Sequence, residues 1–198
     1  MFKDITAAIR PAVVMTLLFA SLLGLVYPAL ITGIGQVAFP DQANGSLIRQ
    51  GDLVVGSSLI GQRFISPRYF HGRPSAAGKG YDATASSGSN LGPTSKALVA
   101  RVSADLVAIR HSSTSPAPAD LVTTSASGLD PEISPETALW QVDRVAAARG
   151  LPVGTVGALV ASQIREPLLG IIGAPRVNVL LLNRALDSLP RTGAKAVE

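Results

Sequence analysis

The pattern of hydrophobic and polar positions divides the chain into an apolar N-terminal segment and a longer segment of mixed character. No Asp, Glu, Lys or Arg occurs in the range 11–40, and residues 12–34 are almost all apolar. A bilayer core about 30 Å thick is crossed by about 20 helical residues, and in hydrocarbon an isolated segment pairs all of its backbone groups only as a helix. The pattern therefore predicts one transmembrane helix over residues 11–36, preceded by a cytoplasmic N-terminus over residues 1–10.

The charges before this helix help to decide whether it is a cleaved signal peptide or a retained anchor, and how it is oriented. Lys3 and Arg10 precede the apolar run, as they would in a secretory signal peptide. A signal peptide has a shorter apolar region, of about 7–15 residues, and a small-residue cleavage site. Here the apolar run continues past Pro28 and no Ala-x-Ala sequence follows. We therefore expect a retained anchor with its N-terminus in the cytoplasm and the remaining chain outside, because positive charge favours the inner side.

The residues inside the helix indicate packing against other helices rather than a transport path. Its clearly polar side chains, apart from a tyrosine, are Thr16, Ser21, Thr32 and Gln36. Transport paths usually require ionisable groups or rings of carbonyls, and one helix cannot enclose a pore. Ala20 and Gly24 form a small-residue pair that lets a second helix approach, although membrane helices are generally rich in small residues. Pro28 cannot bond to the carbonyl of Gly24, so we expect the helix to kink or loosen there.

The rest of the chain is predicted to form a mixed α/β (α+β) soluble domain over residues 41–190, followed by a flexible tail over 191–198. Short apolar runs between Gly, Pro and Ser predict strands or extended turns at residues 53–55, 59–64, 121–126 and 177–182. Apolar residues at helical spacing predict helices at residues 95–110, 135–149, 153–165 and 184–189. A stretch rich in Gly, Ser and Pro, residues 66–93, predicts a long loop, and its aromatic residues indicate more than a linker.

Polar residues beside apolar runs predict helix ends and one buried hydrogen bond. Ser134 followed by Pro135 is typical of an N-cap and the first helical position, and Gly150 is expected to end that helix. Asn183 is expected to cap the last helix. Asn178 lies inside an apolar run, where its amide is costly unless it is hydrogen-bonded, so we expect it to bridge parts of the core.

The composition argues against several kinds of chemistry. The 198 residues include no Cys, which excludes disulfides, thiolate metal sites and cysteine nucleophiles. Only His71 and His111 offer imidazoles. The sequence GRPSAAGKG departs from the phosphate-binding P-loop pattern, because Arg73 stands at the pattern's first position and Gly80 at its last. Asp120, Asp130 and Glu132 could bind a metal or transfer protons, but ordinary turn chemistry is the stronger interpretation. We predict neither catalytic residues nor metal ligands in this chain.

Basic and aromatic residues alternate within residues 63–81, and the net charge of +4 is modest. That alternation is compatible with nucleic-acid binding, but a location outside the membrane argues against such a partner. Tyr, Phe and Arg are enriched in protein interfaces, so we predict that the loops 69–75 and 87–93 contact a partner protein. An alternative of nearly equal weight is that these loops only fold onto their own domain. The contact candidates are Tyr69, Phe70, His71, Arg73, Ser75, Ser89 and Asn90.

Six sequence motifs occur in an order that resembles one known family along almost the whole chain. They are GSSLIGQRF from residue 56, YFHGRPSA from residue 69, SGSNLGPTS from residue 87, DLVTTSASGLDPEISPETA from residue 120, then QVDRVAAARGL and GAPRVNVLLLN. In this respect the chain resembles the KdpC family, the C subunits of the bacterial potassium-transporting Kdp ATPase. Each motif alone is modest, but the ordered set is specific.

The resemblance implies an accessory subunit of a four-subunit complex in the bacterial inner membrane. Its partners would be a channel-like potassium-binding subunit (KdpA), a P-type ATPase subunit (KdpB), a small single-helix subunit (KdpF) and the lipid bilayer. The chain contains neither a DKTGT phosphorylation motif nor a TVGYG filter. We therefore expect no cofactor of its own, with ATP, Mg and potassium handled by the partner subunits. The resemblance thus implies a chain that is not an enzyme by itself.

The resemblance also implies a role as a catalytic chaperone that raises the ATP affinity of the ATPase subunit. That role requires access to cytoplasmic ATP, whereas the charges before the helix favour a periplasmic domain, which is the placement we expect. Two alternatives remain open from the residues alone. One is a membrane-anchored extracytoplasmic binding or assembly protein with no transporter. The other, less favoured, is an enzyme whose pocket joins His71 with Asp120 or Asp130.

Overall fold

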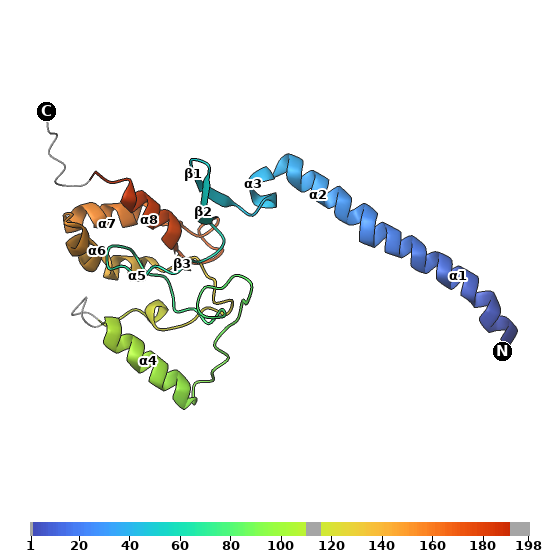
Figure 1. Ribbon diagram of the computed structural model, residues 1–198, viewed down its shortest axis with the longest axis horizontal. Helices are drawn as coiled ribbons and strands as arrows, with labels where there is room; N and C mark the ends of the chain where they lie inside the picture. The colour runs from blue at the N-terminus through green and yellow to red at the C-terminus, as the bar shows by residue number, and fades with distance from the viewer. Residues whose placement is uncertain (1, 110–115, 191–198) are drawn as a thin grey trace. The chain divides into compact units, whose positions relative to one another are not determined.

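The computed structural model of the protein describes residues 2–109 and 116–190, and the chain forms two units, residues 1–47 and 48–198 (Figure 1). His111 and the tail 191–198, which the sequence predicts to be flexible, lie outside the described residues. The boundary between the units falls after residue 47, whereas the pattern of the sequence starts the soluble domain at residue 41.

The N-terminal unit is one continuous apolar helix followed by a single short turn of helix. It consists of α1 (Phe2–Ser21), the π-helix η1 (Leu22–Val26), α2 (Tyr27–Ala38) and α3 (Pro40–Ala43). The stretch Thr6–Ala38 spans 33 residues, reaches a mean hydropathy of 2.2 and buries none of its most apolar window in the protein. This helix is long and apolar enough to cross a membrane. It begins at Phe2 rather than near residue 11, so the predicted N-terminal segment is itself helical.

The predicted loosening near Pro28 is present as a π-helical turn. The N–H of Tyr27 bonds to the carbonyl of Leu22, five residues earlier instead of four. Pro28 has no N–H to donate to the carbonyl of Gly24, so the regular ladder cannot continue through this point. Insertion of one π turn is a common way for a helix to absorb such a defect.

The second unit begins with a small hairpin and a long irregular segment. Strands β1 (Leu47–Gln50) and β2 (Leu53–Ser57) pair with each other around Gly51, whose φ of 61° favours glycine. The predicted strand at residues 53–55 is therefore confirmed, but residues 59–64 form turns and irregular structure. Residues 58–95, all described, contain neither helix nor strand, as the loop prediction requires.

Helices make up most of the remaining unit, and Figure 1 shows α5 to α8 gathered together. The elements are α4 (Lys96–Ile109), the 3₁₀ turn η3 (Ala119–Leu121), β3 (Glu132–Ile133), α5 (Pro135–Trp140), α6 (Val142–Arg149), α7 (Val153–Ser162), β4 (Val177–Asn178) and α8 (Val179–Asp187). Strands β3 and β4 are antiparallel, with Ile133 opposite Val177. One apolar helix and a separate unit of helices with two small sheets confirm the predicted fold class.

The helix-end predictions are largely confirmed. The Ser134 hydroxyl accepts a hydrogen bond from the Thr137 N–H at 3.2 Å, and Gly150 ends α6 in the left-handed conformation with a φ of 67°. The single helix predicted over residues 135–149 is instead divided at Gln141 into α5 and α6. Leu139, just before this break, is 49% exposed.

One strand prediction is wrong, and a second is confirmed for only two residues. In the segment 121–126 the Thr123 hydroxyl bonds to the carbonyl of Ala119 at 2.8 Å, a local bond that competes with strand formation. In the segment 177–182 only the first two residues are strand, and the run then continues as α8. Asn178, not Asn183, is the N-cap, because its side chain accepts a bond from the Leu181 N–H at 3.1 Å. An unbroken apolar run suits a buried helix as well as a buried strand.

The hydrophobic core lies among α5, α6, α7, α8 and the β3–β4 pair. Its buried members are Phe70, Ile133, Ala138, Val142, Val145, Ala146, Val156, Val160, Val177, Val179, Leu182 and Leu186. Phe70 is the one member that comes from the long irregular segment, and it is fully buried. The core therefore fixes this part of the loop, which confirms that the loop is more than a linker.

Candidate functional site

Two buried side-chain amides hold the predicted contact loop against the helices. Asn183 of α8 accepts a hydrogen bond from the Phe70 N–H at 2.8 Å and donates one to the Phe70 carbonyl at 2.9 Å. Gln141, between α5 and α6, bonds in the same way to the N–H and carbonyl of His71, at 2.8 and 3.0 Å. Each amide thus satisfies both backbone groups of one residue, as a neighbouring strand would do. The loop is held without any sheet.

Arginines on α6 complete this attachment. Arg144 donates to the carbonyls of Pro67 and Tyr69 at 2.7 and 3.0 Å. Arg149 donates to the carbonyl of Arg68 at 2.7 Å, pairs with Asp187 at 2.8 Å, and lies 4.7 Å from the centroid of the Tyr69 ring. Cation–π and carboxylate contacts of this kind orient the tyrosine. The Tyr69 hydroxyl donates to Asp187 at 3.1 Å.

Burial shifts the pKa of His71 at the centre of this loop. Desolvation, and then the positive charge of Arg144, lower its pKa below the ordinary value, while a bond to the carbonyl of Ser66 opposes the shift. The Nε2 atom lies 3.0 Å from that carbonyl oxygen. The imidazole is therefore neutral at neutral pH, and its contact with Ser66 helps to hold the loop.

The next residues of the loop bind the segment after η3. Arg73 donates to the carbonyl and hydroxyl of Thr123, both at 3.2 Å, and pairs with Asp130 at 3.4 Å. The Ser75 hydroxyl donates to the carbonyl of Gly128. The Tyr81 hydroxyl donates to the carbonyl of Arg73, and burial, followed by the charge of Asp130, raises its pKa to about 12. This half of the loop is also held by its own domain.

The remaining predicted contact residues are not part of the segment 69–81. Ser89 is half-buried and Asn90 is exposed, with a φ of 52°. Ala20 and Gly24 are exposed on the N-terminal helix, and no described atom outside the local helix lies within 4 Å of the position that a Cβ on Gly24 would occupy. A second helix could therefore approach Gly24 closely. Contact of any of these residues with a partner stays a prediction.

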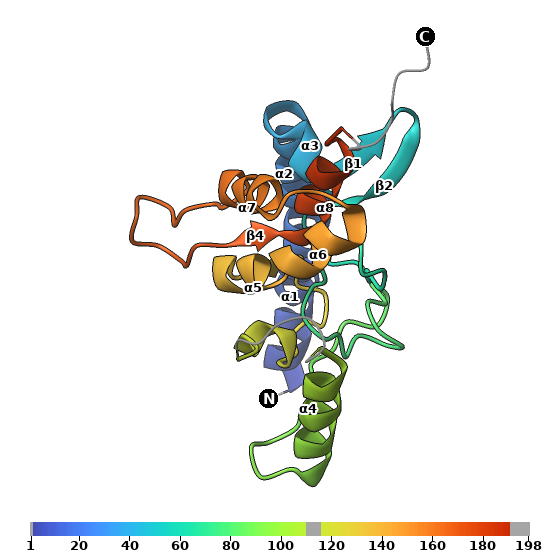
Figure 2. The ribbon, with the colours of Figure 1, turned by 90° about the vertical axis from the view of Figure 1, so that its left-hand side faces the viewer.

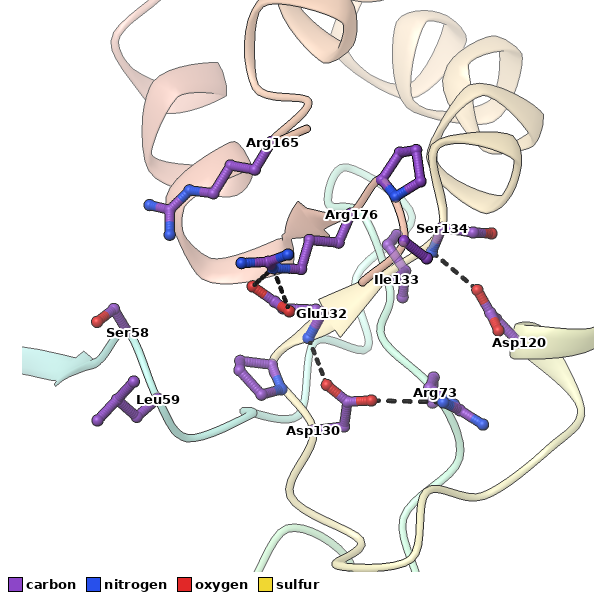
Figure 3. Close-up of a pocket in the computed structure, with 13 residues that line it drawn as sticks. Ser58, Leu59, Arg73, Asp120, Asp130, Glu132, Ile133, Ser134, Arg165 and Arg176 are labelled. Carbon is purple, nitrogen blue, oxygen red and sulfur yellow. Dashed lines mark hydrogen bonds and ion pairs between the residues drawn. The ribbon is translucent and has the colours of Figure 1, made fainter. Parts of the chain in front are cut away.

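A pocket of about 730 Å³ opens beside the β3–β4 pair (Figure 3). Asp120, Asp130 and Glu132 line it together with the arginines Arg73, Arg165 and Arg176. The figure shows Arg176 directed at Glu132, and their ion pair measures 3.0 Å. The pocket therefore carries three acidic and three basic side chains, and most of them are paired.

The carboxylates of this pocket already have structural partners. Asp120 accepts hydrogen bonds from the N–H of Ser134 at 2.8 Å and the hydroxyl of Thr137 at 3.2 Å. Burial pushes the pKa of Asp120 upward, but the bonds from Ser134 and Thr137 and the charge of Arg73 outweigh burial and hold it below its usual value. The Asp130 carboxylate accepts the N–H of Glu132 at 3.0 Å. This is the turn and cap chemistry that the sequence favours for these acids.

The pocket does not bring together the residues of a hydrolytic site. His71 lines a different pocket from the one that Asp120 and Asp130 line. Within residues 2–109 and 116–190 no group of three or more His, Asp and Glu side chains could hold a metal ion.

Sequence reasoning missed the residues that position the loop. The sequence patterns do not single out Gln141, Arg144 or Arg149, and they predict only a helix cap for Asn183. The available signal was an amide inside an apolar helical run, because a buried amide requires hydrogen-bond partners. Asn178 was recognised in this way, and its amide does bridge the core to the carbonyl of Ser58 at 2.8 Å.

Comparison with known proteins covers nearly the whole chain. The family model described as "KdpC: K+-transporting ATPase, c chain" matches residues 9–188. A protein of Caulobacter vibrioides is 62% identical over 182 residues, covering 91% of this chain and 92% of its own length. A Gemmatimonas aurantiaca protein is 58% identical, covering 93% and 94%. A Myxococcus xanthus protein is 53% identical, covering 94% and 89%. Each of these relatives is named potassium-transporting ATPase KdpC subunit.

Proposed function

Because the chain belongs to the KdpC family of potassium-transporting ATPase subunits, we propose that it is a non-catalytic accessory subunit of an ATP-driven potassium uptake complex. Its helix anchors it beside a channel-like subunit, a P-type ATPase subunit and a small single-helix subunit. Its folded unit lies on the periplasmic side and stabilises the extracytoplasmic potassium entrance of the channel-like subunit. ATP, Mg and potassium are handled by those partners.

The observation that carries this proposal is the uncharged stretch of the N-terminal helix. The helix is continuous from Phe2 to Ala38, and none of its residues after Arg10 is Asp, Glu, Lys or Arg. A helix of this kind is stable in hydrocarbon but offers no ionisable group or open carbonyl ring to a moving cation. The potassium path must therefore be built by other chains.

The folded unit is also consistent with ATP being handled by a partner subunit. The carboxylates of the pocket beside β3 and β4 are engaged in caps, turns and ion pairs with the chain itself, and two of its arginines, Arg73 and Arg176, are paired with them. A triphosphate is usually bound by unpaired cations or by backbone N–H groups arranged in a loop. A stabilising contact is more compatible with this surface than nucleotide chemistry.

Membrane topology provides the sharpest test. The chain contains no Cys, so single cysteines can be introduced at exposed positions, Ala158→Cys on α7 and Ala8→Cys on α1. In intact cells expressing the whole complex, a membrane-impermeant maleimide should label Ala158→Cys, whereas Ala8→Cys should react only after the inner membrane is opened. The opposite pattern would place the folded unit in the cytoplasm. The catalytic-chaperone role, which requires access to ATP, would then replace this proposal.

A second experiment separates a subunit from an independent anchored protein. The complex is solubilised in mild detergent and the chain is purified through an affinity tag. Copurification of two large membrane subunits is expected. Purification of the chain alone, from cells that contain those subunits, would favour an extracytoplasmic binding or assembly protein instead.

A further inference from the structure

A hairpin between α7 and β4 extends away from the helices (Figure 2). Its base is held by paired backbone bonds between Arg165 and Arg176, at 2.8 and 3.1 Å. Nearer the tip, Leu168 and Ile172 exchange two more bonds, each of 3.0 Å. The hairpin therefore has a defined, hydrogen-bonded structure. We call residues 168–172 the tip.

The tip exposes four large aliphatic side chains. Leu168 is 66% exposed, Leu169 81%, Ile171 82% and Ile172 57%, with Gly170 between them. Single exposed aliphatic residues are ordinary, but a contiguous apolar group at a protruding tip is typical of an interaction site. Water contact with these side chains is unfavourable, and none of the four belongs to the hydrophobic core of the unit.

The backbone conformation at the tip is unfavourable for the leucine that occupies it. Leu169 has a φ of 56° and Gly170 a φ of 74°, and the Ile171 N–H bonds to the carbonyl of Leu168 at 3.2 Å. Two consecutive positive φ values of this kind favour Asn, Asp or Gly at the first position. A leucine there is strained and exposed, so neither local conformation nor the core accounts for it. Residues held in this way are concentrated at functional contacts.

The charges at the base indicate what kind of surface the tip meets. Arg165 is followed by Glu166, and Arg176 is paired with Glu132 at 3.0 Å, so the four charges balance. A loop that inserts into anionic lipid usually carries excess positive charge and interfacial aromatic residues. The tip has no aromatic residue. An apolar centre surrounded by balanced charges is instead the composition of a protein interface.

We propose that the tip, residues 168–172, inserts into an apolar recess on the extracytoplasmic surface of another subunit of the same ATPase complex. This inference rests on the proposed function, because it requires both a partner subunit and a folded unit outside the membrane. Beyond the proposed function, it identifies the tip as the docking surface and predicts that the recess is apolar. Leu169 and Ile171, the two most exposed side chains, are its central contacts.

Crosslinking in the intact complex tests directly which molecule the tip contacts. A photoactivatable amino acid is placed at position 169 of the full chain, and the complex is irradiated in membranes. An adduct with another subunit of the complex is the expected result. An adduct only with lipid, an adduct only with a second copy of this chain, or no adduct in a complex that copurifies would overturn the tip inference while leaving the proposed function intact. Absence of copurification of the wild-type chain would instead defeat both.

A matched pair of variants measures how much the contact matters. Leu169→Asn with Ile171→Ser removes the apolar tip, and Asn suits the positive φ, so the folded unit should stay intact. Val99→Ser with Val107→Ser makes the same kind of change on α4, where these side chains are 59% and 62% exposed. We expect the tip variant to reduce subunit recovery in detergent about tenfold, the size expected for interface anchors. Recovery equal to that of the α4 variant would contradict the proposal.

Discussion

Replacing Asn183 by Ala tests the amide attachment of the long loop most directly. The side chain is only 1% exposed, and it is the partner of both the N–H and the carbonyl of Phe70, at 2.8 and 2.9 Å. Phe70 is itself fully buried, so water cannot replace the lost bonds without opening the core. Ala at this position therefore leaves two buried backbone groups without partners.

The magnitude follows from the cost of these unpaired groups. A buried donor or acceptor that loses its partner costs about 1–3 kcal/mol, so two such groups predict a loss of about 2–6 kcal/mol. This is a large part of the total stability of a typical domain, about 5–15 kcal/mol. Gln141→Ala should cost somewhat less, because His71 is only half-buried and water can reach it.

The assay is urea unfolding of the full chain in mild detergent. Trp140 is the only tryptophan and directly precedes Gln141, so its fluorescence reports on the helices that hold the loop. Gln50→Ala, which removes an exposed amide, is the control and should change the stability by less than about 0.5 kcal/mol. If Asn183→Ala lost no more than this control, the loop would not depend on its amide. Asn183→Ala combined with Gln141→Ala should lose less than the sum, because both hold the same segment.

Three further changes test other parts of the structure. Gly128→Ala should destabilise the folded unit by at least about 2 kcal/mol, because its φ is 67° and a Cβ would lie 2.6 Å from the Ala77 nitrogen and the Ser87 oxygen. The pKa of His71 is lowered in the folded state, so below pH 6.5, the ordinary His value, the unfolded state binds a proton more readily than the folded state does. The free energy of unfolding should therefore fall as the pH drops below 6.5. His71→Gln should lessen this fall, measured by urea midpoints across that range. Gly24→Leu should leave membrane insertion unchanged but lower subunit recovery, because the small surface it removes is open to another helix.

Matched changes make these outcomes interpretable. Gly92→Ala is the control for Gly128→Ala, since its φ is not in the left-handed range and no described atom lies within 4 Å of its added Cβ. An equal loss in both would remove the steric argument. Gly33→Leu, at another open position of the helix, is the control for Gly24→Leu. Equal recovery of the two helix variants would show that Gly24 is not at a contact. A pH dependence that is unchanged in His71→Gln would exclude this histidine as its source.

Local signals predicted the elements whose stability is local. The uncharged run before residue 40 required a helix, and Ser134 with Gly150 marked two helix ends that the structure contains. The same reasoning failed where two structures suit one pattern. The apolar run that begins at Val177 predicts a strand, but Asn178 caps a helix there and the run continues as α8. β-Branched residues in the segment 121–126 likewise suggested a strand that a local threonine bond replaces.

The contacts of the predicted contact loop could not be deduced from local sequence patterns either. Composition identified Tyr69, Phe70 and Arg73 as notable residues, and the structure binds all three within their own unit. Their partners are more than 100 residues away for Tyr69 and Phe70, since Asp187 and Asn183 lie on α8. No spacing rule connects residues at that separation, so the burial of Phe70 could not be deduced from periodicity.

The amino-acid sequence by itself determined the membrane helix, the irregular segment and, through its ordered motifs, the family. These depend on transfer of side chains from water and on neighbours within a few residues, which composition and spacing record directly. Only the tertiary structure decided which amides hold the loop and which apolar residues remain outside the core. Leu182 and Leu169 are the same residue type, yet one is fully buried and the other is 81% exposed at a hairpin tip. Burial depends on which distant segments meet, and that is settled only when the whole chain has packed.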